Sequence, residues 1–214
     1  LVDARGVRVS NTVGSTAQLA MGAGLDVRAG ATVSWAGSLL EQNTSVNVSV
    51  AGTGASLELV GVRAAAARRE TDAALGAGVS VAAGGHLDAR ACLVEDHSSF
   101  GVRIANGSGR LEHTVIRNTR EVGDGLADAL LVDDGDLTLS RCVLTGADRA
   151  GLLVSSGAAS GTGNVVALNG VGVVSEPGTV SLEDSVLFDN AQGDEVSDPT
   201  LALPASPRDR PAPP

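Results

Sequence analysis

The sequence predicts an all-β chain that folds as a right-handed parallel β-helix, a solenoid of about 7–8 coils with roughly 22 residues per coil and two loop insertions on one edge. Three observations predict this fold class. Apolar residues alternate in short bursts, tight glycine turns separate the bursts, and the pattern returns at a nearly constant length, as in residues 78–99 and 129–150. Alternation with a period of two is typical of a strand with one buried face. The right-handed sense follows from the strong preference of parallel crossover connections.

The rows of the repeat begin at the apolar pair that follows each polar corner. They start near Leu1 (a partial row), Gly24, Val46, Gly78, Phe100, Ala129, Gly151 and Val171. The apolar pairs of the first strand are Leu25 and Val27, Val48 and Val50, Val79 and Val81, Val102 and Ile104, Leu130 and Val132, Leu152 and Val154, and Val171 and Val173. This burst predicts one strand at the start of every complete row.

A glycine turn, such as "AAGG" or "DDGD", follows the first strand and redirects the chain. The pairs of the second strand are Val2 and Ala4, Val33 and Trp35, Leu57 and Leu59, Leu87 and Ala89, Leu137 and Leu139, and Val180 and Leu182. A third, shorter strand combines a small residue with an aliphatic one, as in Cys92 and Val94, Thr114 and Ile116, Cys142 and Leu144, and Ser185 and Leu187. Three strands leave no room for a helix in most rows.

An amide or carboxylate recurs at the corner that closes the row. The corner residues are Asn11, Asn43, Asp96, Asn118, Asn169 and Asn190, whereas two rows have Ala65 and Gly146 there. Asparagine tolerates left-handed backbone angles, which suits a sharp turn. We therefore expect these side chains to occupy one repeated position and to bond along the stack as amide ladders do.

Other repeat folds fit the pattern less well. Antiparallel sandwiches do not require rows of constant length, and the L-x-x-L-x-L consensus of leucine-rich repeats is missing. Rows such as "LTLSRCVLTGA", "VSLEDSVLFDN" and "GTGNVVALNGVGV" resemble those of right-handed parallel β-helix proteins of the pectin-lyase-like superfamily, from residue 1 to about 190. The resemblance implies the fold and an extracytoplasmic setting. Many members are secreted polysaccharide lyases or hydrolases, and others are adhesins, surface proteins or binders.

The composition limits the function classes. Hydrophobic residues make up 43% of the chain and aromatic residues only 1%, so the core must consist of Val, Leu and Ala. The net charge of −10 argues against nucleic acid as a partner, because that binding requires Lys and Arg. No apolar run reaches the ~18 residues of a membrane span. All basic residues are Arg, which indicates a GC-rich, bacterial source.

Two rows are longer than the others, and both extra segments, "RAAAARRETDAALGA" and "NTREVGDGLAD", follow the third strand. Helix formers in the first predict a helical turn or two there. Stacking in register would place both insertions on one edge, two layers apart. That edge would gather Arg68, Arg69, Glu70, Asp96, His97, Arg120, Glu121, Asp124, Asp128, Asp148 and Arg149. Long loops beside a short one predict a groove in which Arg68, Arg69, Glu70, Arg120, Glu121 and Arg149 bind a ligand. The alternative is a set of solvated loops with internal ion pairs.

Catalytic candidates are Asp96, His97 and Asp124 at this edge, and Asp133 and Asp134 in the "DDGD" turn. Clustered carboxylates can bind Ca²⁺ or act as the acid and base of a glycosidase. Neighbouring rows supply no supporting acid, so a plain turn is favoured and no cofactor is expected. The spacing of His and Cys predicts no metal site. Cys92 and Cys142 occupy the same position two rows apart, too far for a disulfide.

We expect residues 1–190 to form the β-helix repeat domain, continued upstream or covered by another chain at its N-terminal edge, and residues 191–214 to form a capping segment and a Pro-rich disordered tail. The leading hypothesis is a secreted or cell-surface scaffold or binding module that contacts polysaccharide without catalysis. The alternative is a polysaccharide lyase or glycoside hydrolase of the same superfamily. The chain could also be part of a larger enzyme whose catalytic coils lie upstream.

Overall fold

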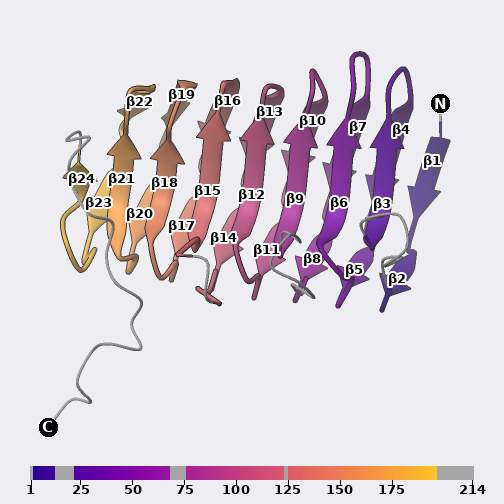
Figure 1. Cartoon of the computed structure of the whole chain (residues 1–214), viewed down its shortest axis with the longest axis horizontal. Helices are drawn as coiled ribbons and strands as arrows, with labels where there is room; N and C mark the ends of the chain where they lie inside the picture. The colour runs from indigo at the N-terminus through magenta and orange to yellow at the C-terminus, as the bar shows by residue number, and fades with distance from the viewer. Residues whose placement is uncertain (1, 13–21, 68–75, 123–124, 197–214) are drawn as a thin grey trace, which may run out of the picture.

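The protein is a stack of coils built from three parallel β-sheets (Figure 1). The computed structural model describes residues 2–12, 22–67, 76–122 and 125–196. Every regular element in these ranges is a strand. Each sheet has eight strands, and each coil contributes one strand to every sheet. The prediction of an all-β solenoid of about eight coils is therefore confirmed, and the right-handed sense stays a prediction.

Sheet C holds the first strands of the rows. They are β3 (Ala23–Arg28), β6 (Val46–Ala51), β9 (Ala77–Ala82), β12 (Phe100–Ala105), β15 (Asp128–Asp133), β18 (Ala150–Val154), β21 (Val171–Ser175) and β24 (Glu195–Val196). The short strand β24 pairs with β21 and lies within residues 191–214, which the sequence assigned to a capping segment and tail.

Sheet A holds the second strands and sheet B the third. Sheet A consists of β1 (Val2–Arg5), β4 (Thr32–Ala36), β7 (Ser56–Val60), β10 (His86–Arg90), β13 (Ser108–Glu112), β16 (Gly135–Ser140), β19 (Gly157–Thr162) and β22 (Thr179–Glu183). Sheet B consists of β2 (Arg8–Ser10), β5 (Leu39–Glu41), β8 (Arg63–Ala65), β11 (Leu93–Glu95), β14 (Val115–Arg117), β17 (Val143–Thr145), β20 (Val165–Ala167) and β23 (Val186–Phe188).

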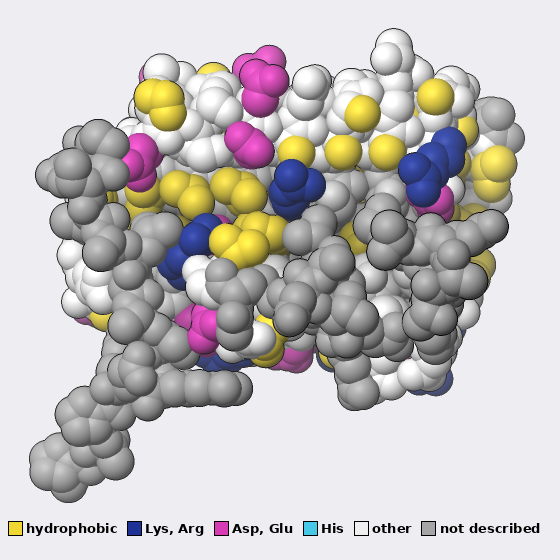
Figure 2. Space-filling model, in the orientation of Figure 1, with side chains coloured by type: hydrophobic (Ala, Val, Ile, Leu, Met, Phe, Trp, Pro, Cys, Tyr) yellow, Lys and Arg dark blue, Asp and Glu magenta, His cyan; other side chains and the backbone are white. Residues whose placement is uncertain are grey.

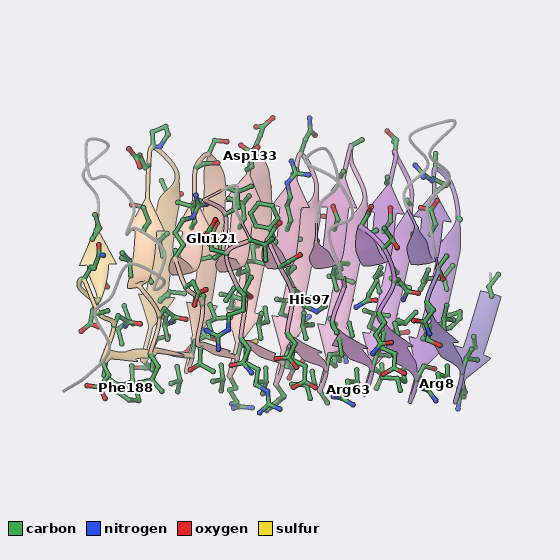
Figure 3. The ribbon with its side chains drawn as sticks, turned by 60° about the horizontal axis from the view of Figure 1, so that its bottom comes forward. Arg8, Arg63, His97, Glu121, Asp133 and Phe188 are labelled. Atoms are coloured by element: carbon green, nitrogen blue, oxygen red, sulfur yellow. The ribbon has the colours of Figure 1, made fainter. Side chains whose placement is uncertain are left out.

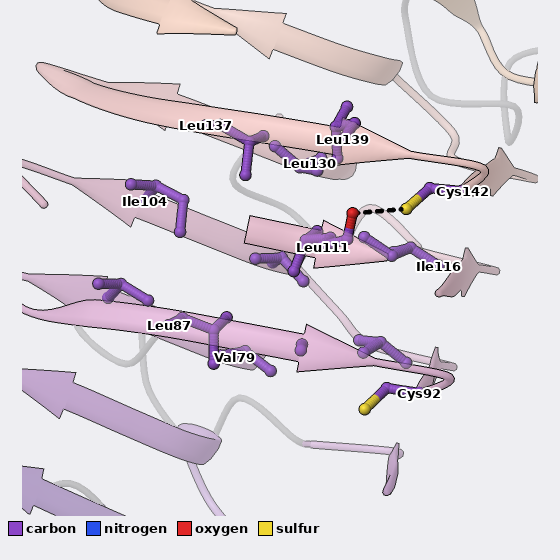
Figure 4. Close-up of a cluster of buried hydrophobic side chains, with 14 of the residues drawn as sticks. Val79, Leu87, Cys92, Ile104, Leu111, Ile116, Leu130, Leu137, Leu139 and Cys142 are labelled. Atoms are coloured by element: carbon purple, nitrogen blue, oxygen red, sulfur yellow. Dashed lines mark hydrogen bonds between the residues drawn. The ribbon is translucent and has the colours of Figure 1, made fainter. Parts of the chain in front are cut away.

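Equivalent residues stack directly above one another, because the parallel strands pair without slippage. In sheet C, for example, Val79 pairs with Val102, which in turn pairs with Leu130. These inward residues are buried and form one aliphatic core through the whole stack (Figure 4). Burial of such side chains contributes about 1.5–3 kcal/mol each. A one-residue slip in any strand would turn its aliphatic residues to solvent, so the alternation in sequence also fixes the register.

Cys92 and Cys142 are free, buried thiols on different coils. Figure 4 shows them apart, with the Cys142 Sγ donating to the carbonyl of Leu111 at 3.3 Å. Burial raises the pKa of both thiols, so they are inert core residues, as their shared repeat position predicts.

Long connections after the third strand occur in three coils, not in two. Residues 66–76 and 118–127 are the predicted insertions, and both link a strand of sheet B to the next strand of sheet C. The third is residues 11–22, between β2 and β3. The sequence hid it because the first row is partial and its length could not be compared. The helical turns expected in the first insertion fall on residues 68–75, outside the described residues.

Candidate functional site

The turn from sheet B to sheet C, the B–C corner, has the same backbone in every coil. The first corner residue has a positive φ in each case: Asn11, Gln42, Ala66, Asp96, Asn118, Gly146, Leu168 and Asp189. The second corner residue follows it and turns toward the interior: Thr12, Asn43, Ala67, His97, Thr119, Ala147, Asn169 and Asn190. The predicted single position is therefore wrong. Asn11, Asp96 and Asn118 are first residues, whereas Asn43, Asn169 and Asn190 are second residues.

Four of the second corner residues, Asn43, His97, Asn169 and Asn190, form an interrupted ladder in which each side chain accepts a backbone amide of the preceding coil. Asn169 shows the pattern: its Oδ1 accepts the amide N–H of Ala147 at 2.9 Å, and its Nδ2 donates to the carbonyl of Leu144 at 3.2 Å. Asn190 repeats it one coil later, accepting from the Asn169 amide and donating to Val166. Asn169 and Asn190 thus each satisfy two backbone groups that the turn would leave without partners. Asn43 accepts the amide N–H of Thr12 but donates to Asn47 Oδ1, and Asn47 Nδ2 in turn donates to the carbonyl of Ala65.

His97 takes the place of an asparagine in this ladder. Its Nδ1 accepts the amide N–H of Ala67 at 3.1 Å, and its Nε2 donates to the carbonyl of Ala64 at 3.1 Å. The side chain is 1% exposed, and burial lowers its pKa from the ordinary 6.5 to about 4. The imidazole is therefore neutral at pH 7, and both ring nitrogens are used by the backbone. This placement argues against the acid–base role for which the sequence singled it out.

The inward side chains of the ladder fit because each of their coils begins with a glycine opposite the corner residue. A Cβ on Gly78 would lie 2.6 Å from His97 Nε2, and one on Gly151 would lie 2.7 Å from Asn169 Nδ2. Gly24 faces Asn43 and Gly172 faces Asn190 in the same way. The coils that close with Ala67 and Ala147 instead open with Asn47 and Ala129. This pairing of glycine with a large corner residue is the sequence signal that would have marked His97 as buried.

Arg149, expected to bind a ligand, is committed to a buried ion pair with Asp128. Its Nε donates to Asp128 Oδ1 at 2.7 Å, its Nη2 to Oδ2, and its Nη1 to the carbonyl of Gly125 at 3.1 Å. Asp128 also accepts the amide N–H of Ala150 at 3.2 Å. A bidentate pair of this kind anchors the insertion at residues 118–127 to the first strand of the next coil.

A second charged cluster lies on the outer face of sheet B. Glu95 is 3% exposed and accepts from Arg63 at 2.6 Å and from Arg117 at 2.6 Å, in the coils on either side. Burial by itself would raise the pKa of Glu95, but the hydrogen bonds and charges of the two guanidinium groups outweigh burial and lower it. Because the two arginines come from the coils before and after Glu95, the cluster links three successive coils and has a structural role.

A groove of about 300 Å³ runs across the B–C corners of four successive coils. It is lined by Arg120, Gly146, Ala147, Asp148, Leu168, Asn169, Gly170, Asp189 and Ala191. The Arg120 Nη1 donates to Asp148 Oδ1 at 2.8 Å, and Asp148 Oδ2 accepts the amide of Glu121. Arg120 and Asp148 thus lie on the edge that the sequence predicted, but this groove extends from the second insertion over the following coils and does not lie between the two insertions. Leu168 and Asp189 were missed because nothing in the alternating pattern marks them.

The remaining predicted residues do not converge on this groove. Figure 3 shows Asp133 at one end of the long strands, away from Glu121 and His97. Its Oδ1 accepts hydrogen bonds from the hydroxyls of Ser155 and Ser156 in the next coil. These bonds hold the turns of adjacent coils together, which agrees with the favoured prediction of a structural turn. Asp134 is exposed at the same turn, and Asp96 accepts from Asn118 at 3.1 Å. Arg68, Arg69, Glu70 and Asp124 lie outside the described residues.

Neither a metal site nor a membrane-spanning helix occurs in the described part of the chain. It contains no cluster of three or more His, Cys, Asp or Glu residues that could hold a metal ion. Nor does it contain a helix long and apolar enough to cross a membrane. The outer face of sheet C carries rows of hydrophobic side chains with charged ones between them (Figure 2).

Three stacked parallel sheets joined by repeated corners define the chain as a parallel β-helix repeat protein. No family model and no curated protein matches its sequence. Among solved structures, it is similar to the periplasmic alginate epimerase AlgG, with a TM-score of 0.54 and 9% sequence identity. The likeness covers 79% of this chain and 42% of that protein, so the chain spans less than half of its length. At this identity the likeness shows the shared fold alone.

Proposed function

We propose that this protein is a secreted or cell-surface β-helix module that binds polysaccharide without catalysing a reaction. The groove across the B–C corners carries the proposal. Its lining comes from four successive coils, so it follows the stack rather than forming a closed pocket. Strand spacing repeats the corner about every 4.8 Å, which suits a linear polymer that presents the same group many times.

The contacts of the candidate acids and bases support binding rather than catalysis. A general acid or base must reach the reacting atom and exchange its proton. His97 is buried with both ring nitrogens bonded to the backbone, and Arg149 is held by Asp128. Asp133 lies at a different edge of the stack. None of these three residues therefore supplies an acid or a base to the groove. Of the two carboxylates in the lining, Asp148 is held by Arg120 and by the amide of Glu121.

The fold also supports the proposal. AlgG, which shares the β-helix architecture, is a periplasmic protein that acts on alginate, a polysaccharide. This likeness favours an extracytoplasmic location and a polysaccharide ligand for the present chain, and at 9% identity it does not carry over an activity.

A glycan array of the purified chain, run beside assays for reducing ends and unsaturated products with and without Ca²⁺, tests the proposal. We expect binding with no product. Arg120→Ala should weaken binding several-fold, because this arginine lines the groove, whereas Arg110→Ala on the outer face of sheet A should not. Arg68→Ala and Arg69→Ala test the predicted loop contacts. Turnover, or a complete lack of binding, would overturn the proposal.

A further inference from the structure

We propose that the groove takes an uncharged glycan, with Leu168 and Phe188 packing against the apolar faces of its sugar rings and Asp189 accepting hydrogen bonds from its hydroxyls. This inference rests on the proposed function and names the chemical class of its ligand. Three observations carry it: an exposed leucine on an unfavourable backbone, an exposed aromatic ring beside it, and the charge of the groove.

Leu168 stands out among the first residues of the B–C corners. Its φ is +59°, a conformation that a bulky side chain adopts at a cost and that Asn, Asp or Gly adopts readily. Seven equivalent positions hold Asn11, Gln42, Ala66, Asp96, Asn118, Gly146 and Asp189. Leu168 is also 62% exposed, the largest exposure of any large hydrophobic residue in the described ranges. Leu168 therefore carries two costs, a strained backbone conformation and an apolar side chain exposed to water. Folding alone does not account for both, whereas a contact with a ligand does.

Phe188 extends this apolar surface onto the next coil. It pairs with Ala167, the residue before Leu168, so Phe188 lies on the adjacent coil, on sheet B beside the groove and outside its lining. The ring is 43% exposed, and Figure 3 shows Phe188 near the C-terminal end of the stack. Val186, on the same face of β23, is exposed as well. The face of an aromatic ring is electron-rich and attracts polarised C–H groups, which cover one face of many sugar rings.

The charge of the groove selects against anionic polymers. Arg120 is the basic residue of the lining, and its guanidinium is paired with Asp148. The acidic residues of the two last coils, within 171–196, are Glu176, Glu183, Asp184, Asp189, Asp194 and Glu195, and this segment contains no Lys or Arg. Such a surface repels carboxylate- or sulfate-bearing chains.

Asp189 supplies the polar part of the contact. It is the first residue of the last B–C corner, it is exposed, and it lines the groove. Its carboxylate has no hydrogen-bond or ion-pair partner among the described residues. An ionised carboxylate only accepts hydrogen bonds, and sugar hydroxyls are donors within reach of a ligand that lies on the apolar surface. An uncharged glycan satisfies it without the repulsion that a polyuronate would meet.

Native affinity electrophoresis distinguishes the ligand classes. The intact chain is run at pH 7.5 through gels that contain an uncharged polymer (mixed-linkage β-glucan, galactomannan or dextran) or an anionic one (alginate or polygalacturonate). We expect retardation by at least one uncharged polymer. Retardation by the anionic polymers alone would overturn the uncharged class but leave the proposed function standing. Retardation by none, with no binding on the glycan array, would overturn both.

Variants test the residues. Leu168→Asn, which places at the corner the residue type found at Asn11 and Asn118, and Phe188→Ser should each weaken binding of the uncharged polymer tenfold or more. Val60→Thr replaces an exposed apolar side chain on sheet A and is the matched control. Unchanged retardation of both Leu168→Asn and Phe188→Ser, with thermal unfolding like that of the wild type, would overturn the assignment of these residues.

Discussion

Acidification should destabilise the protein through His97. The Nδ1 atom must remain unprotonated to accept the amide N–H of Ala67, and the buried ring cannot carry a charge at low cost. The pKa of His97 falls from 6.5 to about 4 on folding. A lowered pKa in the folded state means that the unfolded chain binds the proton more tightly. Stability is therefore present above pH 6.5 and is lost as the pH falls through 4.

The magnitude follows from the size of this shift. Each pKa unit corresponds to ~1.4 kcal/mol, so His97 should withdraw about 3 kcal/mol of unfolding free energy between pH 7.5 and pH 4. This is a large part of the stability of an ordinary domain, about 5–15 kcal/mol in total.

Urea unfolding of the wild type and of His97→Asn at both pH values measures the effect. Asparagine does not titrate, and at Asn169 it makes the same two backbone bonds. Carboxylates such as Glu95 titrate in both proteins, so the difference between the two unfolding free energies isolates the histidine. We expect the wild type to lose about 3 kcal/mol relative to the variant on acidification. Parallel pH profiles would refute the ladder role of His97.

Three further changes test the ladder and the ion pair by urea unfolding at pH 7.5. Gly78→Ala should cost about 1–3 kcal/mol because its Cβ would lie 2.5 Å from Val94 Cγ1 and 2.6 Å from both the Gly101 carbonyl oxygen and His97 Nε2. Adding His97→Ala should relieve only the His97 part of that cost, and strictly additive effects would argue against this contact. Thr119→Asn should stabilise by about 1 kcal/mol, because Thr119 Oγ1 is buried without a hydrogen-bond partner among the described residues and an amide at this position can add to the ladder. A loss of stability would count against this role of the corner. Arg149→Met should cost about 3–5 kcal/mol of unfolding free energy by leaving the fully buried Asp128 carboxylate without its guanidinium partner. Replacing both partners should cost less. An unchanged urea midpoint for Arg149→Met would contradict the ion pair.

The architecture could be predicted from the sequence, whereas much of the candidate site could not. Alternation with period two and a constant row length identify strands, their inward residues and their stacking, as the columns through Val79 and Leu87 show. The edge of the groove was predicted, because insertions after the third strand must share an edge when rows stack in register. Its position along that edge was not: the groove covers the coils after the second insertion and not the row between the two insertions. Its lining was predicted only in part: Arg120 and Asp148 were named, but Leu168 and Asp189 were not.

By itself, the sequence determined the solenoid, its register and the edge at which its long connections lie, since these depend on a periodicity that a single chain displays. Only the tertiary structure decided which of two neighbouring corner residues turns inward, that His97 serves as a buried ladder residue, and that Arg149 is held by Asp128. The physical reason is that the side-chain direction at a corner depends on the sign of φ at the preceding residue and on the space left by a glycine at the start of the same coil, as with Gly78 and His97. Neither is visible in a local alternating pattern, and both arise only when the coil closes on itself.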